Sequence, residues 1–417
     1  MFPRKVFKEL KKEAKNRKIC MLIGARQVGK TTILKELFSE LSGTNKCLFL
    51  DLDVISNYEK VSSFEILVNT LKANDYDEKQ EECFYLFLDE FQKYPSLPKI
   101  MKNVYDNLEN VKIYASGSSS LTIKDQIQES LAGRKKIIEL FPLDFEEFLW
   151  FKNEMLSKNL KNLVKLKGES LDKAIKEFDI FLREFLIFGG YPETALKKSK
   201  EEKKEVLESI FDLYVKKDLV EYLKIEKILE VKKLIEFLSV NNGQKIKYED
   251  ISDLTSMNFK EIKRYIEILN ETYLISILRP FYTNKNKELV KIPKIYFLDN
   301  GVRNFFINNF NNLSLRDDAG FLFEGFIISE FIKRGIKNLK FWQDKNSNEI
   351  DIIAENEIPI EVKFKQKIKS EDLRGIDNFT KEYPKTKKSY LINLSIQKKS
   401  GKTDFLLPYS LTKIFNT

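Results

Sequence analysis

The stretch Gly24-Ala-Arg-Gln-Val-Gly-Lys-Thr-Thr32 lies between an apolar run, residues 18–23, and a helical pattern, residues 33–41. It has the form G-x-x-x-x-G-K-T in the strand–loop–helix setting in which that motif binds nucleotide phosphates. The glycines allow backbone N–H groups to turn toward the phosphates, and the helix N-terminus adds its positive dipole. We therefore predict a site for ATP and Mg²⁺. The residues expected to surround the phosphates are Gly24, Ala25, Gln27, Val28, Gly29, Lys30, Thr31 and Thr32.

A second apolar run, residues 84–88, ends in the acidic pair Asp89 and Glu90. We expect Lys30 to reach the β- and γ-phosphates, and Thr31 and Asp89 to hold Mg²⁺. Glu90 is placed to orient and deprotonate the attacking water. An isolated acidic pair at a strand end is more often a helix cap, but its combination with the phosphate loop favours catalysis.

Two further places are candidates for nucleotide contact. The run 112–117 ends in serines, of which Ser118 or Ser119 could sense the γ-phosphate. A serine-rich turn that caps the next helix is an equal alternative for either serine. Arg134 is either an arginine finger that reaches the nucleotide of a neighbouring subunit in a homo-oligomer, or a surface arginine.

Five short apolar runs alternate with helical patterns between residues 17 and 143. Each run is rich in β-formers and ends in polar residues or glycine, which predicts an α/β fold with a parallel sheet covered on both faces. Active groups then gather at the carboxyl ends of the strands. The predicted domains are a P-loop ATPase core (1–143), a helical lid (144–230), a winged-helix module (231–299) and a small α/β domain (300–417).

Composition limits the chemistry that the chain can perform. Its 417 residues are 42% hydrophobic, which suffices for two or three domains. Histidine is absent, which excludes histidine bases, histidine–metal sites and Ser-His-Asp triads within the chain. Cys20, Cys47 and Cys83 form no close pair, which suits a reduced, cytoplasmic protein. The charged amphipathic N-terminus is not a signal peptide, and no run approaches the ~18 apolar residues of a membrane span.

Three short helical patterns followed by a hairpin, within residues 231–299, describe a winged helix. The third helix carries Lys260, Lys263 and Arg264, but glutamates lie beside them and weaken a reading of the DNA major groove. The lysine-rich loop 284–291 suits phosphate contact better. The net charge of +9 fits a nucleic-acid partner, although a lysine-rich composition alone explains it. Winged helices also bind proteins; we prefer DNA.

An acidic–lysine pattern occurs in the last domain. Side chains alternate along a strand, so Glu361 and Lys363 share one face, and Asp351 on the preceding strand could meet Glu361. Two close carboxylates would bind a divalent ion, and the lysine would position water or stabilise a phosphate. Glu324 lies on an apolar helical stripe and needs a partner, such as the same ion. The alternative is an exposed polar face on an edge strand, where lysines resist edge pairing.

A set of short motifs in fixed order runs along nearly the whole chain. They are Pro3-Arg4, GARQVGKTT (24–32), LFLDEFQKYP (86–95), ASGSSS (115–120), LAGR (131–134), FPLDFEEF (141–148), FGGYPE (188–193) and PKIYFLDNG (293–301). Together they resemble the prokaryotic AAA-type ATPases that join an N-terminal P-loop ATPase domain (AAA_14-like) to a C-terminal DUF4143-type domain. The resemblance implies an ATPase core, a winged-helix-like module and a C-terminal domain similar to the PD-(D/E)xK nuclease fold.

Three functions follow from these patterns. The first is an ATP-driven enzyme that acts on DNA. Whether Asp351, Glu361 and Lys363 cleave the DNA is left open, because such folds also serve as DNA clamps. The second is a nucleotide-dependent switch or scaffold whose C-terminal domain binds nucleic acid or protein without cleaving. The third is a helper ATPase for another protein.

Overall fold

A computed structural model describes residues 3–79, 81–118, 130–152, 155–156, 160, 163, 166, 168–222, 225–284, 286, 288 and 291–415. The chain divides into two compact units. The first comprises Met1–Pro142 with Leu213–Ile225 and Glu271–Tyr273, and the second comprises Leu143–Asp212, Glu226–Asn270 and Leu274–Thr417. Among the described residues, no helix is long and apolar enough to cross a membrane.

The first unit is built on a five-stranded sheet in which every neighbouring pair is parallel, with the order β2-β3-β4-β1-β5. Each strand coincides with an apolar run, so the prediction of an α/β fold with a parallel sheet is confirmed. Its elements, in chain order, are α1 (Lys5–Glu13), β1 (Ile19–Gly24), α2 (Lys30–Leu41), β2 (Cys47–Asp51), α3 (Ile55–Glu59), α4 (Phe64–Lys72), β3 (Phe84–Asp89), η1 (Phe91–Lys93), α5 (Leu97–Asn107), β4 (Val111–Ser118) and β5 (Lys135–Leu140), with the π-helical segment η3 (Tyr214–Tyr222).

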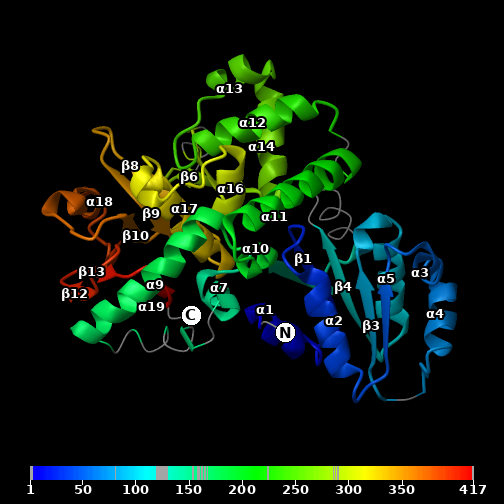
Figure 1. Ribbon diagram of the computed structural model, residues 1–417. Coiled ribbons are helices and arrows are strands. Elements are labelled where there is room, and N and C mark those ends of the chain that lie inside the picture. Colours follow the sequence, from blue (N-terminus) through cyan, green and yellow to red (C-terminus); the bar gives the residue numbers. More distant parts are fainter. Residues whose placement is uncertain are drawn as a thin grey trace. The chain divides into compact units, whose positions relative to one another are not determined.

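Both faces of this sheet are covered, because consecutive side chains of the central strands point to opposite faces and are all buried. On one face, Met21 and Leu86 lie in a core shared with α4 and α5. On the other face, the Phe87 ring contacts Phe38 of α2, and the Tyr114 hydroxyl donates to the carbonyl of Leu10 in α1. Figure 1 shows α1 and α2 on one side of the strands and α3 to α5 on the other. This burial fixes the strand ends that carry the predicted nucleotide site.

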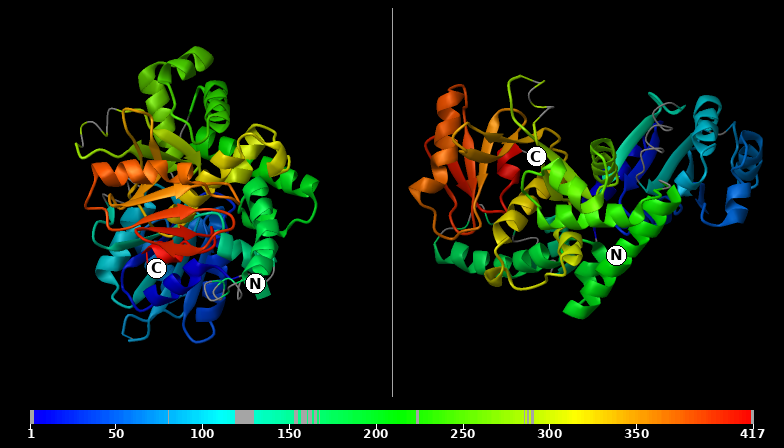
Figure 2. Two further views of the ribbon diagram at one scale, coloured as in Figure 1. Left: turned by 90° about the vertical axis from the view of Figure 1, so that its left-hand side faces the viewer. Right: turned by 90° about the horizontal axis from the view of Figure 1, so that it is seen from above.

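The second unit contains a mixed eight-stranded sheet with the order β12-β13-β11-β10-β9-β8-β6-β7. Its C-terminal strands are orange to red in Figure 2. Its helices are α7 (Phe145–Lys152), α9 (Glu169–Phe188), α10 (Pro192–Leu196), α11 (Lys200–Leu213), α12 (Ile228–Val240), α13 (Tyr248–Thr255), α14 (Phe259–Glu271), α16 (Asn300–Phe306), η4 (Leu313–Leu315), α17 (Ala319–Lys333), η5 (Ser370–Leu373), α18 (Arg374–Glu382) and α19 (Thr412–Phe415). Its strands are β6 (Ile275–Pro280), β7 (Lys294–Phe297), β8 (Leu339–Gln343), β9 (Glu349–Ala354), β10 (Ile358–Val362), β11 (Ser389–Ile392), β12 (Lys398–Ser400) and β13 (Thr403–Leu406).

The three helices and the hairpin predicted for residues 231–299 are present as α12, α13, α14 and the antiparallel pair β6–β7. The hairpin does not stand apart, however, because β6 also pairs in parallel with β8, with Arg279 opposite Lys340. Its strands therefore extend the C-terminal sheet, and no sheet boundary falls at residues 299–300. The helices of residues 144–212 also belong to the second unit. The winged-helix and nuclease-like assignments stay predictions.

Candidate nucleotide and acidic–lysine sites

The phosphate loop connects β1 to α2 with the backbone that its glycines allow. Gly29 has a φ of 96°, and Gln27 has a φ of 58°, a left-handed conformation that is uncommon outside glycine. A Cβ on Gly24 would lie 2.0 Å from the carbonyl oxygen of Leu140, because β5 passes directly beside this position. The glycine at the start of the motif is thus required by strand packing, and the one at its end by the turn into the helix.

Lys30, the first residue of α2, points back into the loop. Its Nζ donates to the carbonyl oxygens of Gly24, at 3.0 Å, and Ala25, at 2.7 Å, and the side chain is buried. Buried polar atoms lie in the same loop and on β4: Gln27 Oε1 and Ser118 Oγ have no hydrogen-bond partner among the described residues. Unpaired buried polar atoms are costly. A phosphate group with its bound water would supply the partners, so these residues fit a nucleotide.

Asp89, at the end of β3, and Thr31, in the first turn of α2, are brought close enough for the Thr31 hydroxyl to influence the Asp89 carboxyl. Asp89 is 1% exposed and also accepts a hydrogen bond from Ser116. Burial raises the pKa of Asp89, while the bond from Ser116 and the nearby Thr31 hydroxyl oppose the rise. A hydroxyl and a buried carboxylate side by side are oxygen ligands of the type that Mg²⁺ prefers.

Glu90 follows in a left-handed backbone conformation, with φ 57° and ψ 38°. Its carboxylate accepts a hydrogen bond from Gln92 Nε2. The Gln92 side chain packs closely against Gly117 of β4, where a Cβ would lie 2.6 Å from Gln92 Oε1. Non-glycine residues with this backbone carry strain and concentrate at functional sites. The turn therefore directs Glu90 away from the strand, at the edge that carries Thr31 and Asp89.

Ser116, rather than either serine singled out in the sequence, contacts Asp89. Ser118 is buried at the end of β4, beside Gly24 in the parallel register, and its hydroxyl is available to the loop. Ser119 lies outside the described residues. Strand alternation could have identified Ser116, since it places Ser116 and Ser118 on the same face of β4.

Arg4 is a second residue that sequence reasoning did not assign to the site. Its guanidinium is 8% exposed and donates to the carbonyl oxygens of Val28, at 2.7 Å, and Phe141, at 2.9 Å. The side chain thus ties the phosphate loop to the segment that follows β5. The only sequence signal was the pair Pro3-Arg4 in the motif set.

Arg134 is not brought to the phosphate loop of its own chain. It precedes β5 at the amino edge of the sheet, where its carbonyl accepts from the Ile19 amide at 2.8 Å. Its guanidinium forms two hydrogen bonds with the Asp106 carboxylate, at 2.7 and 3.2 Å. A contact across a subunit interface stays a prediction.

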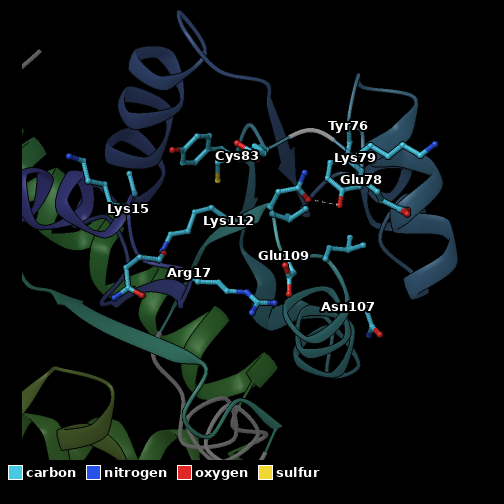
Figure 3. A pocket seen from close by; sticks show the side chains of 16 residues that line it. Lys15, Arg17, Tyr76, Glu78, Lys79, Cys83, Asn107, Glu109 and Lys112 are labelled. Carbon is cyan, nitrogen blue, oxygen red and sulfur yellow. Dashed lines mark hydrogen bonds between the residues drawn. The ribbon is translucent and has the colours of Figure 1, made fainter.

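The amino edge also holds a groove of about 840 Å³, shown in Figure 3. Lys15, Arg17 and Cys83 line it, together with the start of β4. Two of its cations have partners: Lys112 Nζ donates to the carbonyls of Asn16 and Lys18, and Arg17 donates to that of Tyr105. The groove lies at the opposite ends of the strands from the phosphate loop, so it is not part of the predicted nucleotide site.

The predicted C-terminal residues come together in the second unit. The antiparallel register of β9 and β10, in which Ile352 faces Ile360, continues to place Asp351 opposite Glu361. The Asp351 carboxylate accepts from the Val362 amide at 2.8 Å. Lys363 Nζ hydrogen-bonds to Glu361 and lies 3.7 Å from Asp351 Oδ2.

Glu324 joins this cluster from α17 through residues that the sequence reading did not single out. Its carboxylate accepts from the Tyr296 hydroxyl and lies 3.5 Å from Lys294 Nζ, both on β7. Lys294 also pairs with Glu349 of β9 at 2.5 Å. The acidic–lysine network therefore has two adjacent parts, one around Lys294 and one around Lys363, which interact through the charges of Glu324 and Asp351. Strand β7 enters only because the hairpin is part of the same sheet, so no local pattern could have found it.

Burial and like charge dominate the electrostatics of this network. Burial raises the pKa of Glu361 well above its ordinary value, with a further rise from Asp351 and an opposing effect of Lys363. Burial also raises the pKa of Glu324 to about 7, opposed by Lys294. One oxygen of Glu361, Oε2, is buried without a hydrogen-bond partner among the described residues. Perturbed carboxylates of this kind are concentrated at functional sites.

The fit of this cluster to a metal ion is partial. In the part of the chain that the structure describes, no group of three or more acidic or cysteine side chains is placed to hold a metal ion. The two lysines instead neutralise the carboxylates. Glu361 Oε2 and the adjacent Asp351 are the donors that remain for a cation, which is a smaller set than the predicted ligands Glu324, Asp351 and Glu361.

Two of the sequence motifs meet around a buried carboxylate. Asp299, in the LDNG segment, accepts from the amides of Gly190, at 2.7 Å, and Val302, at 3.1 Å. A Cβ on Gly189 would lie 2.0 Å from Asp299 Oδ1, and one on Gly301 would lie 2.1 Å from the Phe188 carbonyl. The FGGYPE and LDNG motifs therefore join α9 to α16 inside the second unit, which is a structural role.

The basic residues of α14 that are predicted to contact DNA are exposed. Lys260, Lys263 and Arg264 lie on the surface of α14. Of the loop 284–291, residues 285, 287, 289 and 290 lie outside the described part. Glu288 is buried and pairs with Lys340 at 2.7 Å. These positions are compatible with phosphate contact on α14 but do not test it.

Three family descriptions match the chain: an AAA domain (AAA_14) over residues 16–149, a domain of unknown function (DUF8612) over 181–313, and another (DUF4143) over 319–411. The chain is 30% identical over 356 residues to the uncharacterized protein MJ1544 of Methanocaldococcus jannaschii, covering 83% of this chain and 74% of the relative. It is 25% identical over 308 residues to MJ1637 of the same organism, covering 69% of this chain and 62% of the relative.

Among solved structures, the chain resembles the Walker-type ATPase PABY2304 of Pyrococcus abyssi, with a TM-score of 0.48, 15% identity, and coverage of 74% of this chain and 96% of that one. This likeness is too low to carry a conclusion. The identity to MJ1544 and the matched domains do carry one. The chain belongs to the same family as MJ1544, and it combines an AAA-type P-loop ATPase domain with a DUF4143 domain.

Proposed function

We propose that the protein hydrolyses ATP in its first unit and uses the nucleotide cycle to act on DNA through its second unit. The observation that supports hydrolysis best is the proximity of Thr31 to the buried Asp89 carboxylate, next to Lys30 and Glu90 at the carboxyl edge of one sheet. An AAA-type P-loop domain implies ATP and a divalent metal, generally Mg²⁺. Thr31 and Asp89 would hold that ion, which supplies positive charge beside the phosphates when bound.

The remaining residues have separate tasks in this proposal. Lys30 exchanges its bonds with the loop carbonyls for bonds with the β- and γ-phosphates. Glu90, oriented by Gln92, accepts the proton of the attacking water. The Ser118 hydroxyl gains a phosphate oxygen as its missing partner.

The test is steady-state ATP hydrolysis by the full chain with Mg²⁺. We expect Lys30→Ala to lose nucleotide binding, and Glu90→Gln to retain binding but lose turnover by about 100-fold or more, the scale of a general base. The matched controls are Lys35→Ala, an exposed lysine of the same helix, and Glu82→Gln, an exposed glutamate before β3. Hydrolysis that survives Glu90→Gln at the wild-type rate would exclude Glu90 as the base.

For the second unit, the preferred proposal is metal-dependent DNA cleavage by Asp351, Glu361 and Lys363. It is supported by the opposed carboxylates on β9 and β10, the lysine between them and the unpartnered Glu361 oxygen. The alternative is a nucleotide-dependent switch whose second unit binds nucleic acid or protein without cutting. The pairing of the acids with Lys294 and Lys363, and the smaller donor set, favour that alternative.

Supercoiled plasmid with ATP and Mg²⁺ or Mn²⁺ separates the two. Nicking that is lost in Asp351→Asn and Lys363→Met, but kept in the exposed control Asp377→Asn, would establish cleavage. Nicking that changes in Lys30→Ala would show that the nucleotide controls it. An intact plasmid in every lane, with ATP still consumed, would leave the non-cleaving switch.

A further inference from the structure

A pocket of about 890 Å³ lies in the second unit, between the ends of β6 and β8 and the end of α18. Its walls include Phe281, Tyr282, Trp342 and Tyr383, and its rim includes Lys245 and Lys291. The volume lies in the range of about 300–1,000 Å³ that small ligands occupy in proteins. Neither the nucleotide site nor the proposed cleavage chemistry uses these residues.

Some of the aromatic rings that line the pocket are packed into the core, and others are partly exposed to the pocket. Phe281 and Trp342 are buried, and the Phe281 ring lies 5.5 Å from that of Tyr383. Phe379 packs behind them, 5.3 Å from Trp342 and 4.6 Å from Tyr383 between ring centroids. Tyr282 and Tyr383 are partly exposed to the pocket. A flat ligand could therefore stack on these rings without reorganising the core.

The lysines make one rim of the pocket electropositive. Burial lowers the pKa of Lys245, and the charges of Lys294 and Lys291 lower it further, while Glu349 opposes them. An anion placed among these ammonium groups would relieve their mutual repulsion. Two acidic side chains also line the pocket: Asp344 accepts from the amides of residues 346 and 348, and Glu382 is exposed next to Tyr383.

The pocket adjoins the acidic–lysine network. Lys245 hydrogen-bonds to Gln343, whose amide lies 3.5 Å from Glu349 of the network. Lys245 and Lys294 face each other in a β-bridge, and both lie over the Phe341 ring, at 5.3 and 5.4 Å. A linear polymer that placed one planar group in the pocket would therefore have its neighbouring charged group beside the acidic–lysine network.

We propose that this pocket binds an unpaired nucleobase of a single-stranded nucleic acid, with the adjoining phosphate at Lys245 and Lys291. This rests on the proposed action on nucleic acid and specifies its substrate as a strand with at least one unstacked base. Stacking on aromatic side chains accepts every base, and lysines bind the backbone, so recognition is independent of sequence. The same chemistry is present in single-stranded DNA and RNA.

The two tryptophans of the chain, Trp150 and Trp342, provide the probe. In a Trp150→Phe background, Trp342 alone reports on the pocket, and titration with dT20, rU20 or a blunt 20-base-pair duplex measures both quenching and affinity. We expect quenching by dT20 or rU20 and little by the duplex, and the ratio of the dT20 and rU20 affinities identifies the preferred sugar.

Tyr282→Ala should weaken single-strand binding by about 5- to 100-fold, and Tyr282→Phe should restore it. Lys245→Met should weaken binding and reduce its salt dependence, whereas the control Lys173→Met, at an exposed position of α9, should not alter the quenching.

The possible failures are distinguishable. Single-strand binding that is unchanged in both Tyr282→Ala and Lys245→Met would overturn the pocket while leaving action on nucleic acid intact. Binding of the duplex alone would do the same. Absence of binding to all three probes, with ATP still hydrolysed, would overturn both this inference and the proposed action on DNA.

Discussion

Replacing Arg4 with methionine tests whether one buried side chain holds the phosphate loop in its binding shape. Arg4 donates to the carbonyls of Val28 and Phe141 and is 8% exposed. Methionine keeps much of the length and the apolar stem but has no donor. The substitution therefore removes both bonds and leaves two carbonyl oxygens to find other partners.

The magnitude follows from the two bonds. A hydrogen bond that involves a charged group contributes about 1.5–3 kcal/mol, so losing two at the lower end costs about 3 kcal/mol. For a cooperative unit of about 150–250 residues, each kcal/mol lowers the melting temperature by about 2–4 °C. The transition of the first unit should fall by about 6–12 °C. If half of that energy holds the loop, nucleotide affinity should fall by roughly tenfold.

Two measurements check this prediction: thermal unfolding with and without Mg²⁺-ATP, and titration with a fluorescent ATP analogue. Arg4→Lys should be intermediate, because an ammonium cannot span both carbonyls with a planar fork. Lys8→Met, at an exposed position of α1, is the control and should match the wild type. An Arg4→Met protein with wild-type melting and affinity would refute the reasoning that Arg4 organises the loop.

Three other substitutions test the packing and the buried charges. Gly24→Ala should abolish nucleotide binding and lower the melting temperature of the first unit, because its Cβ would lie 2.0 Å from the Leu140 carbonyl; a variant that binds ATP normally would contradict this. Asp299→Ala should destabilise the second unit by about 2–4 kcal/mol in urea unfolding, since it removes a helix cap and leaves the Gly190 amide unpaired. Burial raises the pKa of Glu324 from 4.5 to about 7, so the native state holds a proton that the unfolded chain has already released. The free energy of unfolding should therefore fall as pH rises between those values, by at most about 3 kcal/mol, and Glu324→Gln should flatten this dependence; an unchanged pH profile would show that another group causes it.

Much of the first unit could be predicted from the sequence. The three central strands, β1, β3 and β4, are short apolar runs that are buried on both faces, and the phosphate loop needs only consecutive residues, Gly24 to Thr32. The meeting of Asp351 with Glu361 could also be predicted, because a short turn joins their strands and fixes the register. These features depend on interactions between residues that are close in sequence, so a local pattern contains them.

Only the tertiary structure decided which distant side chains complete the two sites. Arg4, at the start of α1, reaches the phosphate loop across 24 positions because α1 packs on the sheet. Ser116 reaches Asp89 across 27 positions because β3 and β4 are adjacent in the sheet. Lys294 and Tyr296 join the acidic network because β6 pairs with β8 and so extends one sheet to the predicted hairpin. The pairing partners of a strand depend on the packing of the whole chain, since any strand can offer the same backbone N–H and C=O groups. The sequence by itself therefore determined the nucleotide motif and most of the elements, while the long-range strand pairing determined the composition of each site.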